Sequence, residues 1–224
     1  MDVQKEGLAR MIYAPDKPIA AMALAHGAGA GNEHEFMVAL ANQLCEQGIL
    51  VSSFNFTYMQ MMYEGGKRKP PQKTPLLIEQ FSAELDIVRD FNVPIFIAGK
   101  SLGGRIATMI NAEETAAGCI KGCLVYGYPF IPPGKPEKYD ERTSHLYKQQ
   151  SALMICQGES DTFGNKAFLS EKVEVSTSKQ PWNITWVPDG DHSFKPRKSS
   201  GVTFEQNLEF AVEKSLEFIH NHLR

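Results

Sequence analysis

The sequence predicts an α/β fold, a three-layer sandwich in which helices cover both faces of a mostly parallel central sheet. Short apolar runs of strand length recur along the chain and alternate with segments of helical periodicity. Strands that are apolar almost throughout are typical of parallel sheets buried on both faces. With 224 residues, of which 42% are hydrophobic, the chain is large enough to bury a sizeable core. We therefore expect one domain over residues 1–224.

The expected strands and helices follow from these patterns in chain order. The strands are Leu8–Tyr13 at an edge of the sheet, Ile19–Ala25, Ile49–Phe56, the first half of Pro94–Arg105, Lys121–Tyr126, Ala152–Gln157 and Asn183–Val187. The helices are the segment in which Phe36, Leu40 and Leu44 repeat before Gly48, then Leu76–Phe91, Arg105–Ala112 and Phe204–Leu223. Thr57–Thr74 lacks periodicity and is expected to be a long loop.

The composition argues against several classes of function. A formal net charge of −3 gives no general attraction to nucleic acid or to an anionic membrane, so we expect neither as a partner. The stretch MDVQKEGLARMIYAP does not look like a secretory signal, and no apolar run is long enough to cross a bilayer. Of Cys45, Cys119, Cys123 and Cys156, three lie in or beside apolar segments, and no further Cys or His pair completes a zinc site. We expect a cytoplasmic protein with reduced core thiols and no metal.

One serine stands out because of the glycines around it. Gly99-Lys100-Ser101-Leu102-Gly103 fits G-x-S-x-G, the sharp strand-to-helix turn that holds a nucleophilic serine in strained backbone geometry. Small residues are required two positions either side of the serine, because strand and helix approach closely there. The same pattern also arises by accident in glycine-rich turns without a catalytic role, so the neighbouring loops have to decide between the two.

Two later loops supply the partners that a nucleophilic serine needs. Asp161 follows the strand Ala152–Gln157, and His192 follows Asn183–Val187. The order Ser101, Asp161, His192 is the order of α/β-hydrolases, and loops after parallel strands meet at one edge of the sheet. His192 would take the serine proton, and Asp161 would hold the other ring N–H. Alternatives are Glu159 as the orienting acid, and His192 as a capped loop histidine beside Asp191.

The glycine-rich loop His26–Gly31 is expected at the same edge. Its glycines let backbone N–H groups approach a substrate, so Gly27 and Gly29 are candidate substrate-binding residues. The N–H groups of Ala28 and Leu102 are the candidate oxyanion donors. The loop does not match the dinucleotide pattern, since Asn32 stands where its last glycine is needed, and no phosphate loop follows. No cofactor is expected.

Six motifs carry a family resemblance across nearly the whole chain: HGAGAG at 26–31, FNFTYM at 54–59, GKSLGGR at 99–105, YGYPFIPPGKPEK at 126–138, GESDTFG at 158–164 and DGDHSF at 189–194. With them, the sequence resembles the α/β-hydrolase superfamily. Within it, the chain is similar to a small, nearly cap-less group related to dienelactone hydrolases and to the testis-expressed-protein/acetyltransferase-complex-subunit branch. The resemblance implies the α/β-hydrolase fold without a separate cap domain. Dienelactone hydrolases use a cysteine nucleophile, so Ser101 argues against that activity.

Substrate preferences are harder to read from the sequence. Tyr58 and Met59 are candidate walls of an acyl or alcohol pocket, and the alternative is that they cover core beneath a long loop. Basic residues within 67–73 and 195–198 are either a solvated surface or a rim that selects anionic substrates. Lys100 and Arg105 are expected to be structural, each paired with a carboxylate, because a strand residue beside the nucleophile should point away from it.

Together these features predict a serine hydrolase. It would cleave carboxylic ester or thioester bonds through an acyl-enzyme on Ser101, with a small molecule or an acylated protein as substrate. The alternative function is a scaffold or binding module that keeps the α/β-hydrolase fold without turnover. The intact serine, acid and histidine favour the enzyme.

Overall fold

The structure of the protein is a computed structural model that describes residues 2–6, 9–113, 118–175 and 182–223. Its centre is an eight-stranded sheet with the strand order β1-β2-β4-β3-β5-β6-β7-β8. The strands are β1 (Asp2–Glu6), β2 (Arg10–Ala14), β3 (Ala20–Ala25), β4 (Ile49–Phe54), β5 (Ile95–Lys100), β6 (Gly122–Tyr126), β7 (Ala152–Gly158) and β8 (Asn183–Val187). β3 to β8 run parallel, whereas β2 pairs antiparallel with β1 and β4.

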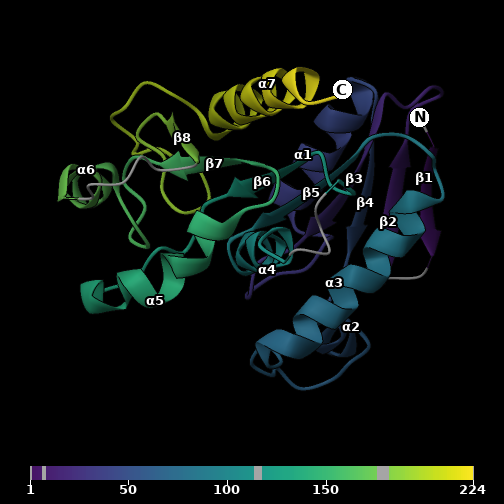
Figure 1. The fold of residues 1–224 in the computed structure, drawn as a ribbon, viewed down its shortest axis with the longest axis horizontal. Helices are drawn as coiled ribbons and strands as arrows, with labels where there is room; N and C mark the ends of the chain where they lie inside the picture. The colour runs from purple at the N-terminus through teal and green to yellow at the C-terminus, as the bar shows by residue number, and fades with distance from the viewer. Residues whose placement is uncertain (1, 7–8, 114–117, 176–181, 224) are drawn as a thin grey trace.

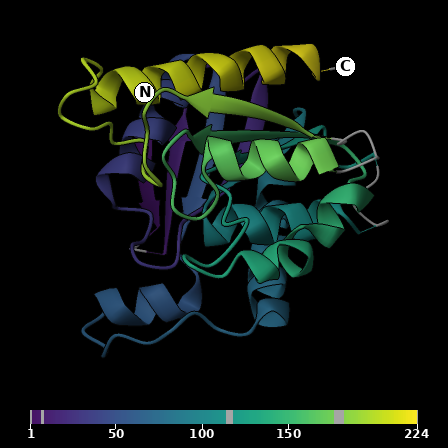
Figure 2. The same cartoon turned by 90° about the vertical axis from the view of Figure 1, so that its left-hand side faces the viewer.

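Helices cover both faces of this sheet (Figure 1). They are α1 (Glu35–Glu46), α2 (Thr57–Tyr63), α3 (Thr74–Arg89), α4 (Leu102–Asn111), α5 (Tyr139–Thr143), α6 (Lys166–Val175) and α7 (Phe204–Asn221), with short 3₁₀ turns at Pro136–Lys138 and Ser144–Lys148. α1 and α7 pack on one face and α3 and α4 on the other. Figure 2 shows α7 running along its side of the sheet. The three layers confirm the predicted fold class.

Alternation along each strand divides the core between the two helical layers. In β5, the side chains of Phe96 and Ala98 pack with α1 and α7, while Ile97 packs with α3 and α4. All three side chains are fully buried. Strands buried on both faces therefore explain the nearly continuous apolar runs in the sequence.

The structure corrects three expectations about the elements. β2 is not an edge strand, because β1 pairs with it from outside; β1 has the sequence DVQKE, which has no apolar pattern to reveal it. Part of Thr57–Thr74 forms the helix α2, which is too short to show helical periodicity. α6 lies in a stretch where the sequence predicted no element.

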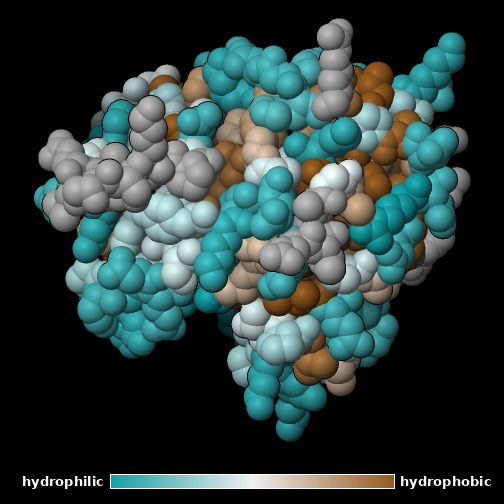
Figure 3. Space-filling model, in the orientation of Figure 1, coloured by the Kyte–Doolittle hydropathy of each residue, from teal (hydrophilic) through white to brown (hydrophobic). Residues whose placement is uncertain are grey.

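The connection between β6 and β7 bears on the predicted lack of a cap. Among the described residues it contains only α5 and the two 3₁₀ turns. The turn Ser144–Lys148 packs on α4, and Tyr139 of α5 joins the core cluster that includes α3 and α4, so these elements do not form a separate cap. α2 and the start of α3 extend from the body and form the lower lobe in Figure 3. These two helices carry the exposed side chains of Met61 and Leu76. No helix in the described part of the chain has the length and apolarity needed to span a bilayer.

The four cysteines are free in the structure. Cys45, Cys123 and Cys156 are buried, as their apolar neighbours predict, while Cys119 is exposed. Burial raises the pKa of the Cys123 and Cys156 thiols, so both stay protonated and unreactive at neutral pH. The described residues contain no cluster of His, Cys, Asp and Glu able to hold a metal ion.

Candidate active site

Ser101 stands at the junction of β5 and α4, in the geometry that the sequence motif predicts. Its φ of 52° lies in the left-handed region, which side chains other than glycine rarely adopt. A Cβ on Gly99 would come within 2.3 Å of the Gly103 backbone, and one on Gly103 within 2.5 Å of the Ala25 carbonyl oxygen. These clashes explain why both flanking positions are glycine.

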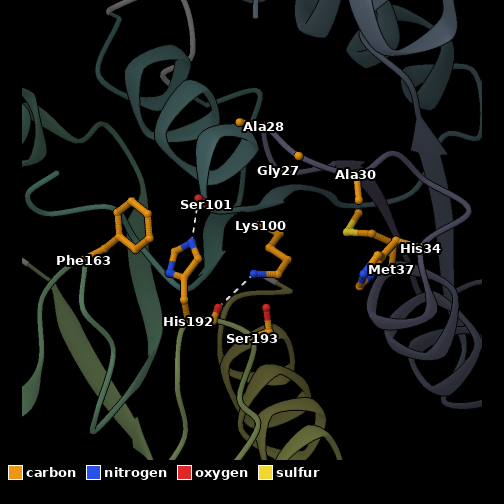
Figure 4. A pocket seen from close by; sticks show the side chains of 11 residues that line it. Gly27, Ala28, Ala30, His34, Met37, Lys100, Ser101, Phe163, His192 and Ser193 are labelled. Carbon is orange, nitrogen blue, oxygen red and sulfur yellow. Dashed lines mark hydrogen bonds between the residues drawn. The ribbon is translucent and has the colours of Figure 1, made fainter. Parts of the chain in front are cut away.

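Ser101, His192 and Asp161 form one hydrogen-bonded chain at the carboxyl edge of the sheet. His192 Nε2 lies 2.8 Å from Ser101 Oγ (Figure 4), and His192 Nδ1 lies 2.8 Å from Asp161 Oδ2. Because a carboxylate only accepts, Nδ1 carries the proton and Nε2 is free to accept from the serine hydroxyl. Asp161 is fully buried, whereas the His192 side chain is 22% exposed. The structure thus brings together the three residues predicted from separate loops.

Asp161 is itself held by two further donors. Gln157 Nε2 donates to Asp161 Oδ2 at 2.8 Å, and the Phe163 N–H donates to Oδ1 at 2.8 Å. The Gln157 side chain is also fixed, since its Oε1 accepts from the Tyr128 N–H at 2.7 Å. Gln157 is not among the residues predicted from the sequence. Its signal was a lone amide inside an apolar strand, four residues before the acid.

Glu159 and Asp191, the two acidic residues named in the alternative predictions, bind other groups. Glu159 pairs with Lys166 and accepts from the Asp189 N–H, which holds the pKa of its carboxyl below the usual range. It therefore does not orient His192. Asp191 folds back on its own loop and accepts the N–H groups of Ser193 and Lys195, so it shapes the turn around His192 without binding its ring.

The loop after β3 is fixed from behind by buried side chains. His26 Nδ1 lies 2.6 Å from the Gly27 carbonyl oxygen, and its Nε2 accepts from the Phe56 N–H at 3.1 Å. Burial lowers the pKa of His26 to about 4, so the ring is neutral and donates through Nδ1. The Tyr58 hydroxyl lies 3.3 and 3.2 Å from the carbonyl oxygens of Gly27 and Ala28 and donates to them.

These bonds orient the candidate oxyanion donor. In a trans peptide unit the C=O and N–H point in opposite directions. The Gly27 carbonyl points at buried groups, so the Ala28 N–H in the same unit points away from them, and Gly27, Ala28 and Gly29 all line the cavity. Leu102 opens α4, where a backbone N–H has no partner inside the helix.

Tyr58 and Met59 do not line the cavity, which corrects their predicted role as a substrate-binding wall. α2 turns both side chains inward, leaving Tyr58 2% and Met59 1% exposed. They belong to the core packed against α3, as the alternative reading of the sequence had it. Tyr58 nevertheless acts on the site from outside, through its bonds to the loop.

The cavity beside Ser101 has a volume of about 280 Å³. Apart from the loop 27–30, Ser101 and His192, its lining consists of residues that the sequence did not single out as substrate-binding: His34, Met37, Lys100, Phe163 and Ser193. In Figure 4, Phe163 lies on one side of Ser101, and His34 and Met37 lie on the other. Both α1 and the loops after β7 and β8 therefore contribute walls.

Lys100 and Arg105 also depart from expectation. Lys100 reaches into the cavity wall, where Nζ donates to the His192 carbonyl oxygen at 2.9 Å. Its side chain lies on the same face of β5 as those of Phe96 and Ala98, which pack with α1 and α7. On this face Nζ contacts the ring of Phe36 in α1. Arg105 Nε is buried without a hydrogen-bond partner. Within the described residues neither Lys100 nor Arg105 forms an ion pair, so the prediction that each is paired with a carboxylate is wrong.

The covered parallel sheet and the turn that carries Ser101 define an α/β protein with the geometry of a hydrolase. The family model of the alpha/beta hydrolase domain matches residues 18–220, and the chain belongs to this family. None of the curated proteins matches the sequence.

Solved structures share the same fold at low sequence identity. Est1E from Butyrivibrio proteoclasticus, solved with bound ferulic acid, is 16% identical with a TM-score of 0.69, and the match covers 94% of this chain and 95% of that one. Dienelactone hydrolase from Anabaena variabilis is 16% identical with a TM-score of 0.70, covering 96% and 92%. A serine hydrolase without a lid from Xanthomonas campestris is 16% identical with a TM-score of 0.68, covering 96% and 88%.

Proposed function

We propose that the protein is a serine hydrolase that cleaves carboxylic esters or thioesters through an acyl-enzyme. The observation that carries the proposal is the continuous hydrogen-bonded chain from Ser101 Oγ through the His192 ring to Asp161. A serine hydroxyl is a weak nucleophile at neutral pH, and a neutral imidazole at 2.8 Å is positioned to take its proton. The buried carboxylate favours the imidazolium that results.

In the first half of the reaction, Ser101 Oγ attacks the substrate carbonyl carbon while His192 Nε2 takes the hydroxyl proton. The oxyanion that forms accepts hydrogen bonds from the N–H groups of Ala28 and Leu102. When the intermediate collapses, the bond to the leaving alcohol or thiol breaks, and His192 returns the proton to that group. The acyl group remains on Ser101 as an ester.

Water completes the cycle by the same steps. His192 takes a proton from a water molecule, whose oxygen attacks the acyl carbon and regenerates an oxyanion in the same place. Collapse breaks the bond to Ser101 Oγ, which recovers its proton from His192. The products are a carboxylic acid and the free enzyme.

The size of the cavity favours a short acyl group. Its volume of about 280 Å³ is just below the usual range for pockets that hold small molecules. A small ester or thioester, or a short acyl group on a protein, fits this space better than a long-chain lipid. Buried free thiols support a cytoplasmic location, where cysteines stay reduced.

A fluorophosphonate probe tests the activated serine directly, because it labels only serines that a base has made nucleophilic. Intact-protein mass spectrometry should show one label on the native chain and none on Ser101→Ala or His192→Ala. Ser193→Ala is the matched control, since Ser193 lines the same cavity outside the hydrogen-bonded chain and its loss should leave labelling intact. If the native chain stays unlabelled while a known serine hydrolase reacts, the scaffold function replaces this proposal.

A further inference from the structure

Lys100 places a positive charge in the wall of the cavity. Its residue is 8% exposed, and Nζ makes one hydrogen bond, to the His192 carbonyl oxygen, and lies 5.0 Å from the centre of the Phe36 ring. An ammonium group carries three donors. Lys100 Nζ binds the backbone carbonyl of His192 and Ser101 Oγ binds its ring, and both residues line the same cavity.

The nearby carboxylates do not neutralise this charge by contact. Asp161 and Asp191 are close enough to favour the charged form, but both are bound to other groups and neither forms an ion pair with Lys100. Burial lowers the pKa of Lys100 to about 8, which still leaves most of the side chain charged at pH 7. A buried charge without a counter-ion is unfavourable, and an anion in the cavity would relieve that cost.

A second donor lies in the wall of the same cavity. His34 Nδ1 accepts from the Phe36 N–H at 3.2 Å, so a proton on the neutral ring is carried by Nε2, which is then a donor. His34 also caps α1, whose N-terminus favours negative charge. Basic residues at the rim are less available, because Lys195 pairs with Glu35 and Arg197 with Asp189.

We propose that the substrate is an ester or thioester that also carries a carboxylate, and that Lys100 Nζ binds this carboxylate beside the reacting carbonyl. The proposal rests on the hydrolase function argued above and specifies its substrate class. One lysine supplies one positive charge, which a single carboxylate balances. Through its bond to the His192 carbonyl, Lys100 is also a positioning residue, so its two roles have to be separated by experiment.

Two matched pairs of esters test whether the bound carboxylate belongs to the acyl group or to the leaving group of the substrate. The first pair is the 4-nitrophenyl half-ester of adipic acid and its neutral primary amide, which differ only at the far end of the acyl group. The second pair is 4-butyryloxybenzoate and 4-butyryloxybenzamide, which differ only in the leaving group. The measured quantity is the ratio of kcat/KM between the charged and neutral member of each pair, at pH 7 and low ionic strength.

In the native chain, we expect kcat/KM in one of the two pairs to be about tenfold or more higher for the charged ester than for the neutral one. The difference should come mainly from a lower KM for the charged ester. Lys100→Met should remove that preference, while Lys195→Met, which loses the same charge at the rim, should keep it. A structural disturbance of His192 would instead lower kcat for both members of a pair equally and leave their ratio unchanged.

The outcomes separate this proposal from the one it rests on. No hydrolysis of any of the four esters together with no fluorophosphonate label would overturn the hydrolase function itself. Hydrolysis of the neutral esters without a carboxylate preference in the native chain would overturn only the role of Lys100, and this result needs no variant to fold. A preference that survives Lys100→Met, or disappears in Lys195→Met, would contradict it as well.

Discussion

Two histidines at the same edge of the sheet show how partners decide what a residue does. His26 follows β3 and His192 follows β8, and each uses both ring nitrogens in hydrogen bonds. The partners of His26 are a backbone carbonyl and a backbone N–H. Those of His192 are a carboxylate and a hydroxyl. His26 is fully buried, whereas the His192 side chain is 22% exposed at the cavity.

This difference separates a structural histidine from an acid–base one. A second proton on His26 would have to displace the Phe56 N–H from Nε2 inside an apolar core, so its ring stays neutral. His192 instead contacts a hydroxyl that can supply a proton and a carboxylate that favours an imidazolium, as the proposed reaction requires. The first region holds the loop in place, and the second is the one that we propose transfers protons.

The largest expected effect is on the His192 side of this comparison. Asp161→Asn replaces the carboxylate by an amide, which no longer holds the Nδ1–H tautomer, so kcat for a 4-nitrophenyl ester should fall about 10⁴-fold. Unfolding in urea and circular dichroism should show that the fold survives. Glu159→Gln is the matched control on the same turn, because Glu159 faces Lys166 and Asp189, and its kcat should stay close to native. Equal losses in both variants would contradict the assignment of Asp161.

The sequence predicts the His192 region better than the His26 region, for a physical reason. Ser101 directly follows β5, and Asp161 and His192 lie in the loops after β7 and β8, so a correct strand assignment is enough to bring them to one edge. Their order along the chain then carries the rest of the inference. The glycines around Ser101 are visible in sequence because the backbone contacts that require them are local.

The supports of the site escape prediction because they join distant residues. Tyr58 reaches Ala28 across 30 positions, from a helix too short to show periodicity. Lys100 reaches His192 across 92 positions, although strand alternation taken alone turns its side chain away from the nucleophile. Such contacts depend on how the layers pack, which local patterns do not encode. The fold, the nucleophile and the cavity-lining loop 27–29 were therefore predictable, while the walls formed by Met37, Lys100 and Phe163 were not.

A smaller effect tests the His26 side through pH. The pKa of His26 is about 4 in the folded chain, against 6.5 for the ordinary side chain. Between pH 6.5 and pH 4 the unfolded state protonates this histidine, whereas the folded state keeps it neutral. Protonation therefore favours unfolding, so the free energy of unfolding is unaffected by His26 above pH 6.5 and decreases as pH falls toward 4. The loss across this window should be about 3 kcal/mol.

Urea unfolding of the native chain and of His26→Gln at pH 7, 5.5 and 4.5 measures this contribution. Carboxylates titrate in the same range in both proteins, so the difference between the two pH profiles isolates the histidine. The native chain should lose stability more steeply on acidification than the variant. Parallel profiles would mean that His26 binds a proton as readily in the folded chain as in the unfolded one.

The smallest effect separates the two tyrosines of α2, which contact the loop at different points. Tyr58→Phe removes the hydroxyl that donates to the Gly27 and Ala28 carbonyls, but keeps the buried ring. The peptide unit that carries the Ala28 N–H then loses one of its restraints. We expect a loss of about 1 kcal/mol of stability and a fall of up to about tenfold in kcat, with KM nearly unchanged, since the oxyanion exists only along the reaction.

Tyr63→Phe is the matched control for this prediction, because the Tyr63 hydroxyl accepts from the Gly31 N–H at 3.0 Å, beyond the loop residues that line the cavity. It should cost similar stability with little change in kcat. If the two variants lower kcat equally, the loop responds to α2 as a whole, and the orientation of the Ala28 N–H does not depend on Tyr58. If only Tyr58→Phe lowers kcat, a buried hydroxyl outside the cavity controls the oxyanion donor, as the Gly27 and Ala28 contacts imply.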